Sequence, residues 1–96
     1  MSATMFSNSN EHEFMNVIIR LTGSWLSIHL VISNDTTVAE LKTEIMDNIG
    51  VHPSHQTLFI HGKVMVNLHL LYNYGVQDGS VITLVTYDQP KLSRYY

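Results

Sequence analysis

The chain has 96 residues, 45% of them hydrophobic, with no cysteine and a formal net charge of −3 at pH 7. This length suits one domain with a modest core, and the lack of cysteine excludes disulfides and thiol catalysis. Five Lys and Arg residues are too few for the cation cluster that a nucleic acid or an anionic membrane needs, so we expect neither partner. Because the apolar runs are short and no signal peptide is recognisable, we expect an intracellular protein, cytoplasmic or nuclear.

The first third of the chain predicts an arm and a β-hairpin. Residues 1–13 are rich in Ser and Asn without apolar periodicity, so we expect a disordered N-terminal arm. Two alternating, β-branched stretches follow at residues 15–21 and 25–32, and Gly23 lies in the turn between them. In the second stretch the alternation directs Trp25 outward, away from the predicted core.

A single amphipathic helix is predicted for residues 37–50. Its apolar positions recur at helical spacing and are Val38, Leu41, Ile45 and Ile49. Thr37 and Glu40 have the spacing of a capping box, in which each side chain satisfies a backbone N–H of the other residue. Gly50 supplies the left-handed conformation that ends the helix.

The second half of the chain predicts three more strands and a loop. The strands are expected at residues 56–61, 64–66 and 81–87, and residues 67–76 suit a loop with one helical turn. We expect a flexible tail over residues 88–96. The predicted core comprises Val17, Ile19, Leu26, Ile28, Leu30, Val38, Leu41, Ile45, Leu58, Ile60, Met65, Leu71, Val76, Ile82 and Leu84. The order ββαβββ indicates an α+β fold in which one helix crosses one face of a mixed five-stranded sheet.

Several short motifs then suggest a family. They are Thr22-Gly23, Thr37-Val38-x-x-Leu41-Lys42-x-x-Ile45, Gly50-Val51-x-Pro53, Gln56-x-Leu58-x-Ile60-x-Gly62-Lys63, Leu71-x-x-Tyr74-x-Val76 and Asp78-Gly79-Ser80. In this register, residues 15–87 resemble ubiquitin and its relatives, the β-grasp fold. The resemblance implies a ubiquitin-like domain over residues 14–87, in agreement with the order of elements.

The end of the chain departs from the conjugated members of that family. Ubiquitin-type modifiers end in two adjacent glycines, which the conjugating enzymes thread through a narrow channel. Here no glycine follows Gly79. The resemblance therefore implies the non-conjugated class, a docking module that usually forms part of a longer protein. A covalent modifier is the alternative that the missing diglycine makes least favourable.

The resemblance also implies a recognition patch on the sheet face away from the helix. The matching positions are Phe59, Val85, Thr83, Lys63 and Thr57. We expect a monomer that docks receptors of the ubiquitin pathway or proteasome subunits there. Because Thr83 and Thr57 replace a histidine and an arginine of the family, ordinary ubiquitin receptors should bind weakly, or another partner should use the face.

Trp25 and Ile18 form a candidate second surface. The alternation places Trp25 outward on the hairpin and near Ile18 of the neighbouring strand. Trp25 can stabilise the sheet there or serve as a binding anchor, and the residues alone leave both roles open. Self-association through such exposed apolar residues is the alternative to partner docking.

The remaining polar residues form no recognisable metal-binding or catalytic pattern. His52, His55 and His61 flank turns without a cysteine or carboxylate that would complete a metal site, and no catalytic arrangement is recognisable, so we expect neither metal, cofactor nor enzyme activity. By resemblance, Tyr74 should bond the backbone of the preceding loop. Lys42 lacks the acidic partner usual in the family, since Asn67 occupies that region. It should be unusually exposed or bond amide and carbonyl groups.

Overall fold

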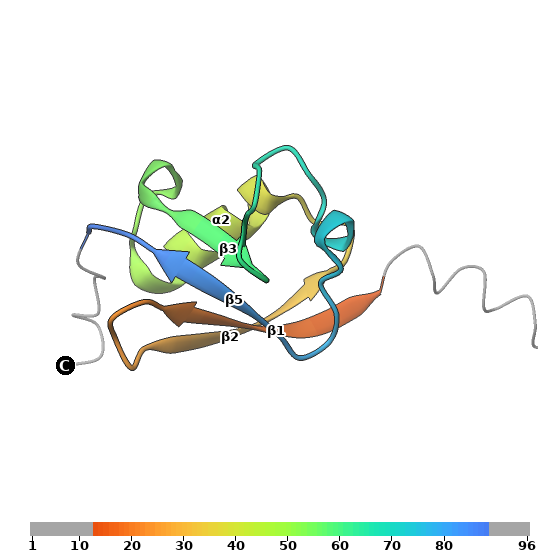
Figure 1. The fold of residues 1–96 in the computed structure, drawn as a ribbon, viewed down its shortest axis with the longest axis horizontal. Coiled ribbons are helices and arrows are strands. Elements are labelled where there is room, and N and C mark those ends of the chain that lie inside the picture. Colours follow the sequence, from red (N-terminus) through yellow and green to blue (C-terminus); the bar gives the residue numbers. More distant parts are fainter. Residues whose placement is uncertain (1–12, 89–96) are drawn as a thin grey trace, which may run out of the picture.

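The computed structural model describes residues 13–88, which form five strands and one α-helix (Figure 1). The elements are β1 (Phe14–Leu21), β2 (Ser27–Ser33), α2 (Val38–Ile49), β3 (Thr57–Ile60), β4 (Lys63–Val64) and β5 (Ser80–Val85). Two 3₁₀ turns, η1 (Pro53–His55) and η2 (Leu71–Tyr74), lie where the sequence predicts a turn and a helical turn. The predicted order of strands and helix is confirmed.

The sheet is mixed, with the strand order β2-β1-β5-β3-β4. The central strands β1 and β5 run parallel, and every other neighbouring pair is antiparallel. The helix α2 packs across one face of this sheet (Figure 1). The other face, which we call the outer face, carries no helix among residues 13–88, so the predicted β-grasp α+β fold is confirmed.

The helix α2 begins and ends as its local sequence predicts. The Thr37 hydroxyl accepts a hydrogen bond from the Glu40 N–H at 3.1 Å, and the Glu40 carboxylate accepts one from the Thr37 N–H at 2.9 Å. This capping box satisfies donors that have no partner within the helix. Gly50 ends the helix with a φ of 76°, which a residue with a Cβ rarely adopts.

The core lies between α2 and the inner face of the sheet. Most of the predicted core residues are buried, but Leu26 and Ile28 are only partly buried. Because β2 begins at Ser27 rather than at residue 25, Leu26 lies in the turn that joins β1 to β2, and Ile28 lies on the edge strand close to that turn. Burial at the other end of the hairpin adds Met15 and Ile32 to the core.

The predicted arm and tail fall almost entirely outside the described residues. Within the described part, the carbonyl oxygen of Glu13 accepts a hydrogen bond from the Asn34 N–H at 2.9 Å, and so continues the pairing of β1 with β2. At the other end, Asp88 contacts His55. Over residues 13–88, α2 is too short and too polar to span a bilayer, and the structure has no longer helix there.

Candidate functional site: the outer face of the sheet

Strand register assembles a row of side chains across the outer face. Phe59 of β3 pairs with Val64 of β4 on one side and with Thr83 of β5 on the other. Thr83 in turn lies opposite Arg20 of β1. Since directly paired residues point to the same face of a sheet, these four side chains from four strands form one continuous row.

Two further pairs extend this row. Thr57 of β3 lies opposite Val85 of β5, and Ile18 of β1 lies opposite Val81 of β5. The paired positions between them, such as Leu58 with Leu84, are buried under α2. The outer-face patch comprises Ile18, Arg20, Thr57, Phe59, Val64, Val81, Thr83 and Val85.

The patch is apolar and open to solvent. Val64 is 53% exposed, and the side chains of Phe59, Thr83 and Val85 are about half-buried against their neighbours on the sheet. A half-buried aromatic ring held on a strand is rigid, so docking a partner on it costs little side-chain entropy. The arrangement offers a shallow recognition surface rather than a chemical site.

Charge is divided between the two faces of the domain. None of the outward-facing residues in the five strands carries a carboxylate, and Arg20 lies in the row itself. The carboxylates of Glu40, Glu44 and Asp47 project instead from α2 on the opposite side of the sheet. The patch therefore suits a partner element that is apolar in the middle and carries Asp or Glu residues at its edge.

Four of the five residues predicted for the patch are brought together, and Lys63 is the exception. Register places Lys63 opposite the buried Ile60, which directs it away from the face that Val64 and Phe59 share. Its side chain lines a shallow hollow with His69 and Tyr74. The sequence prediction failed because it assumed the family position without the two-residue turn that sets the facing of β4.

Tyr74 holds the loop beneath that hollow. Its hydroxyl accepts a hydrogen bond from the backbone N–H of Val66 at 2.7 Å, as predicted. The same hydroxyl lies 2.8 Å from Nδ1 of His69 and can donate to that nitrogen when it carries no proton. Tyr74 thus fixes the chain between β4 and η2 and has a structural role.

The predicted contact of Trp25 with Ile18 is wrong. Ile18 pairs with His29 across the hairpin, whereas Trp25 lies in the turn before β2 begins. The turn is longer than the alternation suggested, so Trp25 has no cross-strand partner in β1. Its side chain is 90% exposed, and only Ile18 contributes to the outer face.

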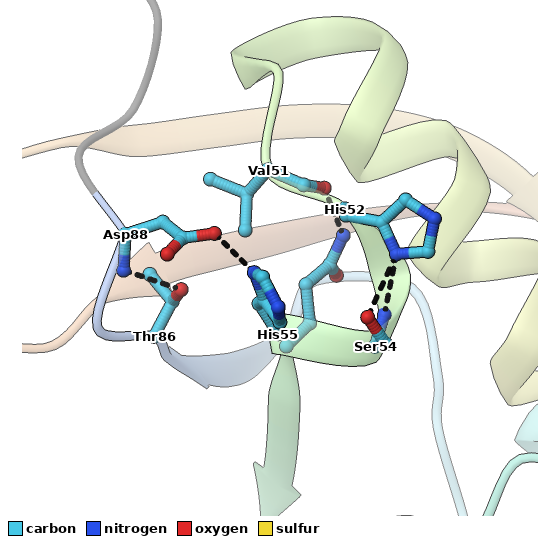
Figure 2. A network of polar contacts seen from close by, with 7 residues as sticks. Val51, His52, Ser54, His55, Thr86 and Asp88 are labelled. Carbon is cyan, nitrogen blue, oxygen red and sulfur yellow. Dashed lines mark hydrogen bonds and ion pairs between the residues drawn. The ribbon is translucent and has the colours of Figure 1, made fainter.

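A polar cluster marks the end of the patch where β3 begins and β5 ends. Nδ1 of His55 lies 2.5 Å from a carboxylate oxygen of Asp88, and the Asp88 N–H donates to the Thr86 hydroxyl at 3.1 Å. Nearby, Nδ1 of His52 accepts a hydrogen bond from the Ser54 N–H at 3.1 Å (Figure 2). These contacts tie the chain that follows β5 to η1, and so fix the Thr57 end of the patch.

A buried amide, not predicted from the sequence, links the helix to β3. Gln56 is 4% exposed, and its side-chain N–H groups donate to the carbonyl oxygens of Lys42 at 2.8 Å and Val51 at 3.0 Å. The only sequence signal was a polar residue just before an apolar strand. Such a position is usually exposed, which explains the failure.

Lys42 follows neither predicted alternative. The residue is 8% exposed, and none of its contacts within the described chain is a side-chain hydrogen bond or an ion pair. Burial lowers the pKa of its ammonium group below the ordinary value of 10.5. Lys42 is thus one of the buried residues of α2, where a lysine stem can cover apolar surface.

The patch residues that sequence reasoning missed are Val64, Val81 and Arg20. The alternation around the buried Met65 does direct Val64 outward, and Arg20 follows the outward phase of β1. Only the pairing of strands that are distant in sequence shows that Val64 and Arg20 belong to one row. Across residues 13–88, no group of three His, Asp or Glu side chains is placed to hold a metal ion.

Comparison with known proteins assigns this arrangement to a family. The family model described as "Ubiquitin family" matches residues 16–88. Among solved structures, the UBL domain of Plasmodium falciparum Dsk2 is 29% identical with a TM-score of 0.72, over 76% of this chain and 97% of that chain. The ubiquitin of Caldiarchaeum subterraneum is 22% identical with a TM-score of 0.73, over 78% of this chain and 95% of that chain, and supports the fold alone. No curated protein matches the sequence.

Proposed function

Because the chain belongs to the ubiquitin family, we propose that it is a non-enzymatic docking module that binds protein partners of the ubiquitin and proteasome system through the outer-face patch. The observation that carries this proposal is the apolar row of Val64, Phe59 and Thr83, which ends at Arg20 and is free of carboxylates. The proposal places the protein in the cytoplasm or the nucleus, where such partners act.

The partner element that fits best is a short amphipathic helix. A shallow apolar strip of one aromatic and several aliphatic side chains suits residues spaced three and four apart on a helix. Arg20 at one end of the row favours a carboxylate at the matching margin of that helix. Thr57 and Thr83 add hydroxyl groups that can bond its polar edge.

The test is a titration of isotope-labelled protein with purified ubiquitin-receptor domains and proteasomal receptor subunits, followed by amide chemical shifts. We expect the shifts to concentrate at Phe59, Val64, Thr83 and Arg20. As a matched control, the same titrations are repeated with the Arg20→Glu variant, which places a carboxylate in the row. Shifts confined to the exposed side of α2 would refute the patch.

Self-association is the second candidate, and the 90% exposure of Trp25 favours it. Contact with a second molecule would bury this ring, which no residue in the described part of the chain covers. Sedimentation at increasing protein concentration distinguishes the two functions, because the docking module should remain monomeric. A dimer that the Trp25→Ser variant abolishes would support the assembly function instead.

A further inference from the structure

The shallow hollow beside Lys63 has a basic and polar surface, and we call it the basic hollow. Its volume is about 620 Å³, within the range of about 300–1,000 Å³ that small-molecule sites occupy. No Asp or Glu of residues 13–88 lines it. Its polar lining residues are His61, Lys63, His69, Asn73 and Tyr74, and the two others are Ile60 and Gly75.

The turn between β3 and β4 brings two of these side chains to the hollow. Ile60 pairs with Lys63, so His61 and Gly62 form a two-residue turn, and their φ angles are 52° and 77°. A turn with two positive φ angles favours Asn followed by Gly. Asparagine would therefore suit the backbone at position 61 at least as well as histidine, so the turn itself does not require the imidazole.

Lys63 supplies a permanent positive charge at the hollow. The residue is exposed, and within residues 13–88 its ammonium group has no hydrogen bond or ion pair. The chain as a whole carries a net charge of −3, so attraction of an anion must come from local groups rather than from the overall field. An unpaired ammonium group in a hollow without carboxylates is such a local group.

His69 is held in place on the opposite side of the hollow. Its backbone N–H donates to the Val66 carbonyl at 3.0 Å, and its carbonyl accepts a hydrogen bond from the Val38 N–H at 2.9 Å. Its ring lies against that of Tyr74, with 5.7 Å between the ring centroids. Little side-chain entropy remains to be lost when a ligand contacts a ring fixed in this way.

Tyr74 also determines which ring nitrogen of His69 is available. Its hydroxyl already accepts from the Val66 N–H, and it lies 2.8 Å from Nδ1 of His69. When the imidazole is neutral, Nδ1 accepts from the hydroxyl and the hydrogen resides on Nε2, whereas both nitrogens carry hydrogens when it is charged. His69 thus keeps an Nε2–H donor in either state, and Tyr74 does not use it.

Asn73 adds a further donor at the hollow. Its side-chain carbonyl accepts a hydrogen bond from the Leu70 N–H at 2.8 Å, which fixes the orientation of the amide. Within residues 13–88 no acceptor bonds its NH₂ group. The hollow therefore combines one ammonium group, two imidazoles and one amide NH₂, contributed by the turn after β3, the strand β4, the loop before η2 and η2 itself.

We propose that the basic hollow binds a phosphomonoester group, carried either by a phosphorylated side chain of a protein partner or by a small phosphorylated molecule. A phosphomonoester has a charge of about −1.5 to −2 at pH 7 and three strong acceptor oxygens. Lys63 would balance part of that charge, and the N–H groups of His69, His61 and Asn73 would donate to the oxygens. A single carboxylate, with one charge and two oxygens, matches this set of groups less well.

The inference does not depend on the outer-face patch. Register directs Lys63 away from the face that Phe59 and Val64 share, so a ligand in the hollow leaves the patch uncovered. The two sites therefore have separate reporters, Phe59 and Thr83 for the patch and Lys63 and His69 for the hollow. Either one can fail without the other.

The experiment is a titration of isotope-labelled protein at constant ionic strength, followed by amide and imidazole chemical shifts. The probes are inorganic phosphate and the capped peptide Ala-Ala-phosphoserine-Ala-Ala, with the same peptide carrying Ser or Asp as controls. We expect saturable shifts at Lys63, Asn73 and the His69 ring from the phosphopeptide, and no binding of the Ser peptide. Phosphopeptide affinity about tenfold above that of phosphate would identify a protein as the source, and equal affinities would identify a small phosphorylated molecule.

Variants at exposed positions test the assigned groups. Lys63→Gln removes the permanent charge and should weaken phosphopeptide binding about fivefold. His61→Asn keeps the left-handed turn and should weaken it about threefold. His29→Asn, the matched control, changes an exposed histidine of β2 at the other edge of the sheet and should have no effect. The amide spectrum of each variant shows that the fold is retained.

Three results would overturn the proposal. The first is equal affinity for the phosphoserine and Asp peptides, because the hollow would then respond to negative charge alone. The second is a set of shifts that spares Lys63 and His69, or that is equally large at His29 and His52 outside the hollow. The third is unchanged phosphopeptide affinity in Lys63→Gln.

Discussion

The side-chain amide of Gln56 donates to the carbonyl oxygen of Lys42 at 2.8 Å, across a separation of 14 residues. A second N–H of the same amide donates to the carbonyl of Val51 at 3.0 Å. Gln56 thereby bonds one carbonyl within α2 and one just after its end, and fixes the start of β3, the strand that carries Phe59. We predict that Gln56→Leu costs about 1–3 kcal/mol of unfolding free energy, because it removes two buried hydrogen bonds and replaces the amide by an apolar group.

Urea denaturation measures this cost, and Gln77→Leu is the matched control. Gln77 is exposed, and its backbone makes its hydrogen bonds: its N–H donates to the Ser80 hydroxyl, and its carbonyl accepts from the Ser80 N–H. The control should change the stability by less than about 0.5 kcal/mol. Equal effects of the two substitutions would contradict the role assigned to Gln56.

The hydroxyl of Tyr74 provides a second stability prediction. Tyr74→Phe removes the acceptor for the Val66 N–H and should destabilise the domain by about 1 kcal/mol. Hydrogen exchange should accelerate at Val66 in particular. Tyr72→Phe, a control at an exposed neighbour on the same 3₁₀ turn, should leave both quantities unchanged. Unchanged exchange at Val66 in Tyr74→Phe would show that the loop is held by other contacts.

The patch predicts the effect of substitutions on partner affinity. Phe59 occupies the middle of the row between Val64 and Thr83, where central aromatic residues usually carry most of the binding energy. Phe59→Ala should weaken a partner found in the titration above by about 2 kcal/mol or more, measured by calorimetry. Val31→Ala, which shortens an exposed apolar side chain on β2 outside the patch, is the control. A partner that tolerates Phe59→Ala but not Val31→Ala would bind beside β2 instead of on the patch.

The fold could be predicted from the sequence wherever local chemistry decides it. The capping box of Thr37 and Glu40 and the left-handed Gly50 define α2 by contacts within a few residues. The hairpin was harder, since the length of its turn depends on where β1 stops pairing with β2. Alternation alone extended the second strand to Trp25, whereas pairing ends at Ser27.

The candidate site was predictable in part for the same physical reason. Alternation along β3 and β5 correctly directs Phe59 and Val85 outward, because each strand has one buried face. The pairing of strands distant in sequence is non-local, so the row that joins Val64 to Arg20 could not be derived from either segment alone. Lys63 was assigned to the patch from its family position alone, and its pairing with Ile60 directs it to the other face.

Asp78 predicts acid sensitivity at the junction of β1 and β5. Hydrogen bonds from the backbone N–H of Asn16, at 2.7 Å, and from its side-chain amide, at 3.0 Å, lower the pKa of Asp78 below its ordinary value of 3.8. A carboxyl group with a lowered folded-state pKa stabilises the fold above its unfolded pKa, and this stabilisation disappears as the pH falls through the folded value. Asp78→Ala should therefore destabilise the domain at pH 7 and have a smaller effect below pH 3.8.

Denaturation of wild-type and Asp78→Ala proteins across this range checks the prediction. The difference in stability between the two proteins should be constant from neutral pH down to about pH 5, because the Asp78 carboxyl group is ionised in both the folded and the unfolded state there. Below about pH 5 the difference should decrease. A difference that stays constant into strong acid would mean that Asn16 bonds Asp78 without regard to its charge. In that case the junction would be held by the backbone bond from the Gly79 N–H to the Asn16 carbonyl, at 2.7 Å.

Lys42 leads to a second pH prediction, at alkaline pH. Burial lowers the pKa of its ammonium group, so the folded state releases this proton at a lower pH than the unfolded state, whose ordinary value is 10.5. Below the folded-state pKa the buried charge costs stability, and between the two values the unfolded state holds more protons, so stability rises with pH. Lys42→Met keeps the apolar stem and removes the charge. It should stabilise the domain by about 0.5–1 kcal/mol at pH 7, and this gain should shrink as the pH approaches 10.5. A variant less stable than wild-type at pH 7 would show instead that the ammonium group makes a net favourable contact with solvent or with the chain.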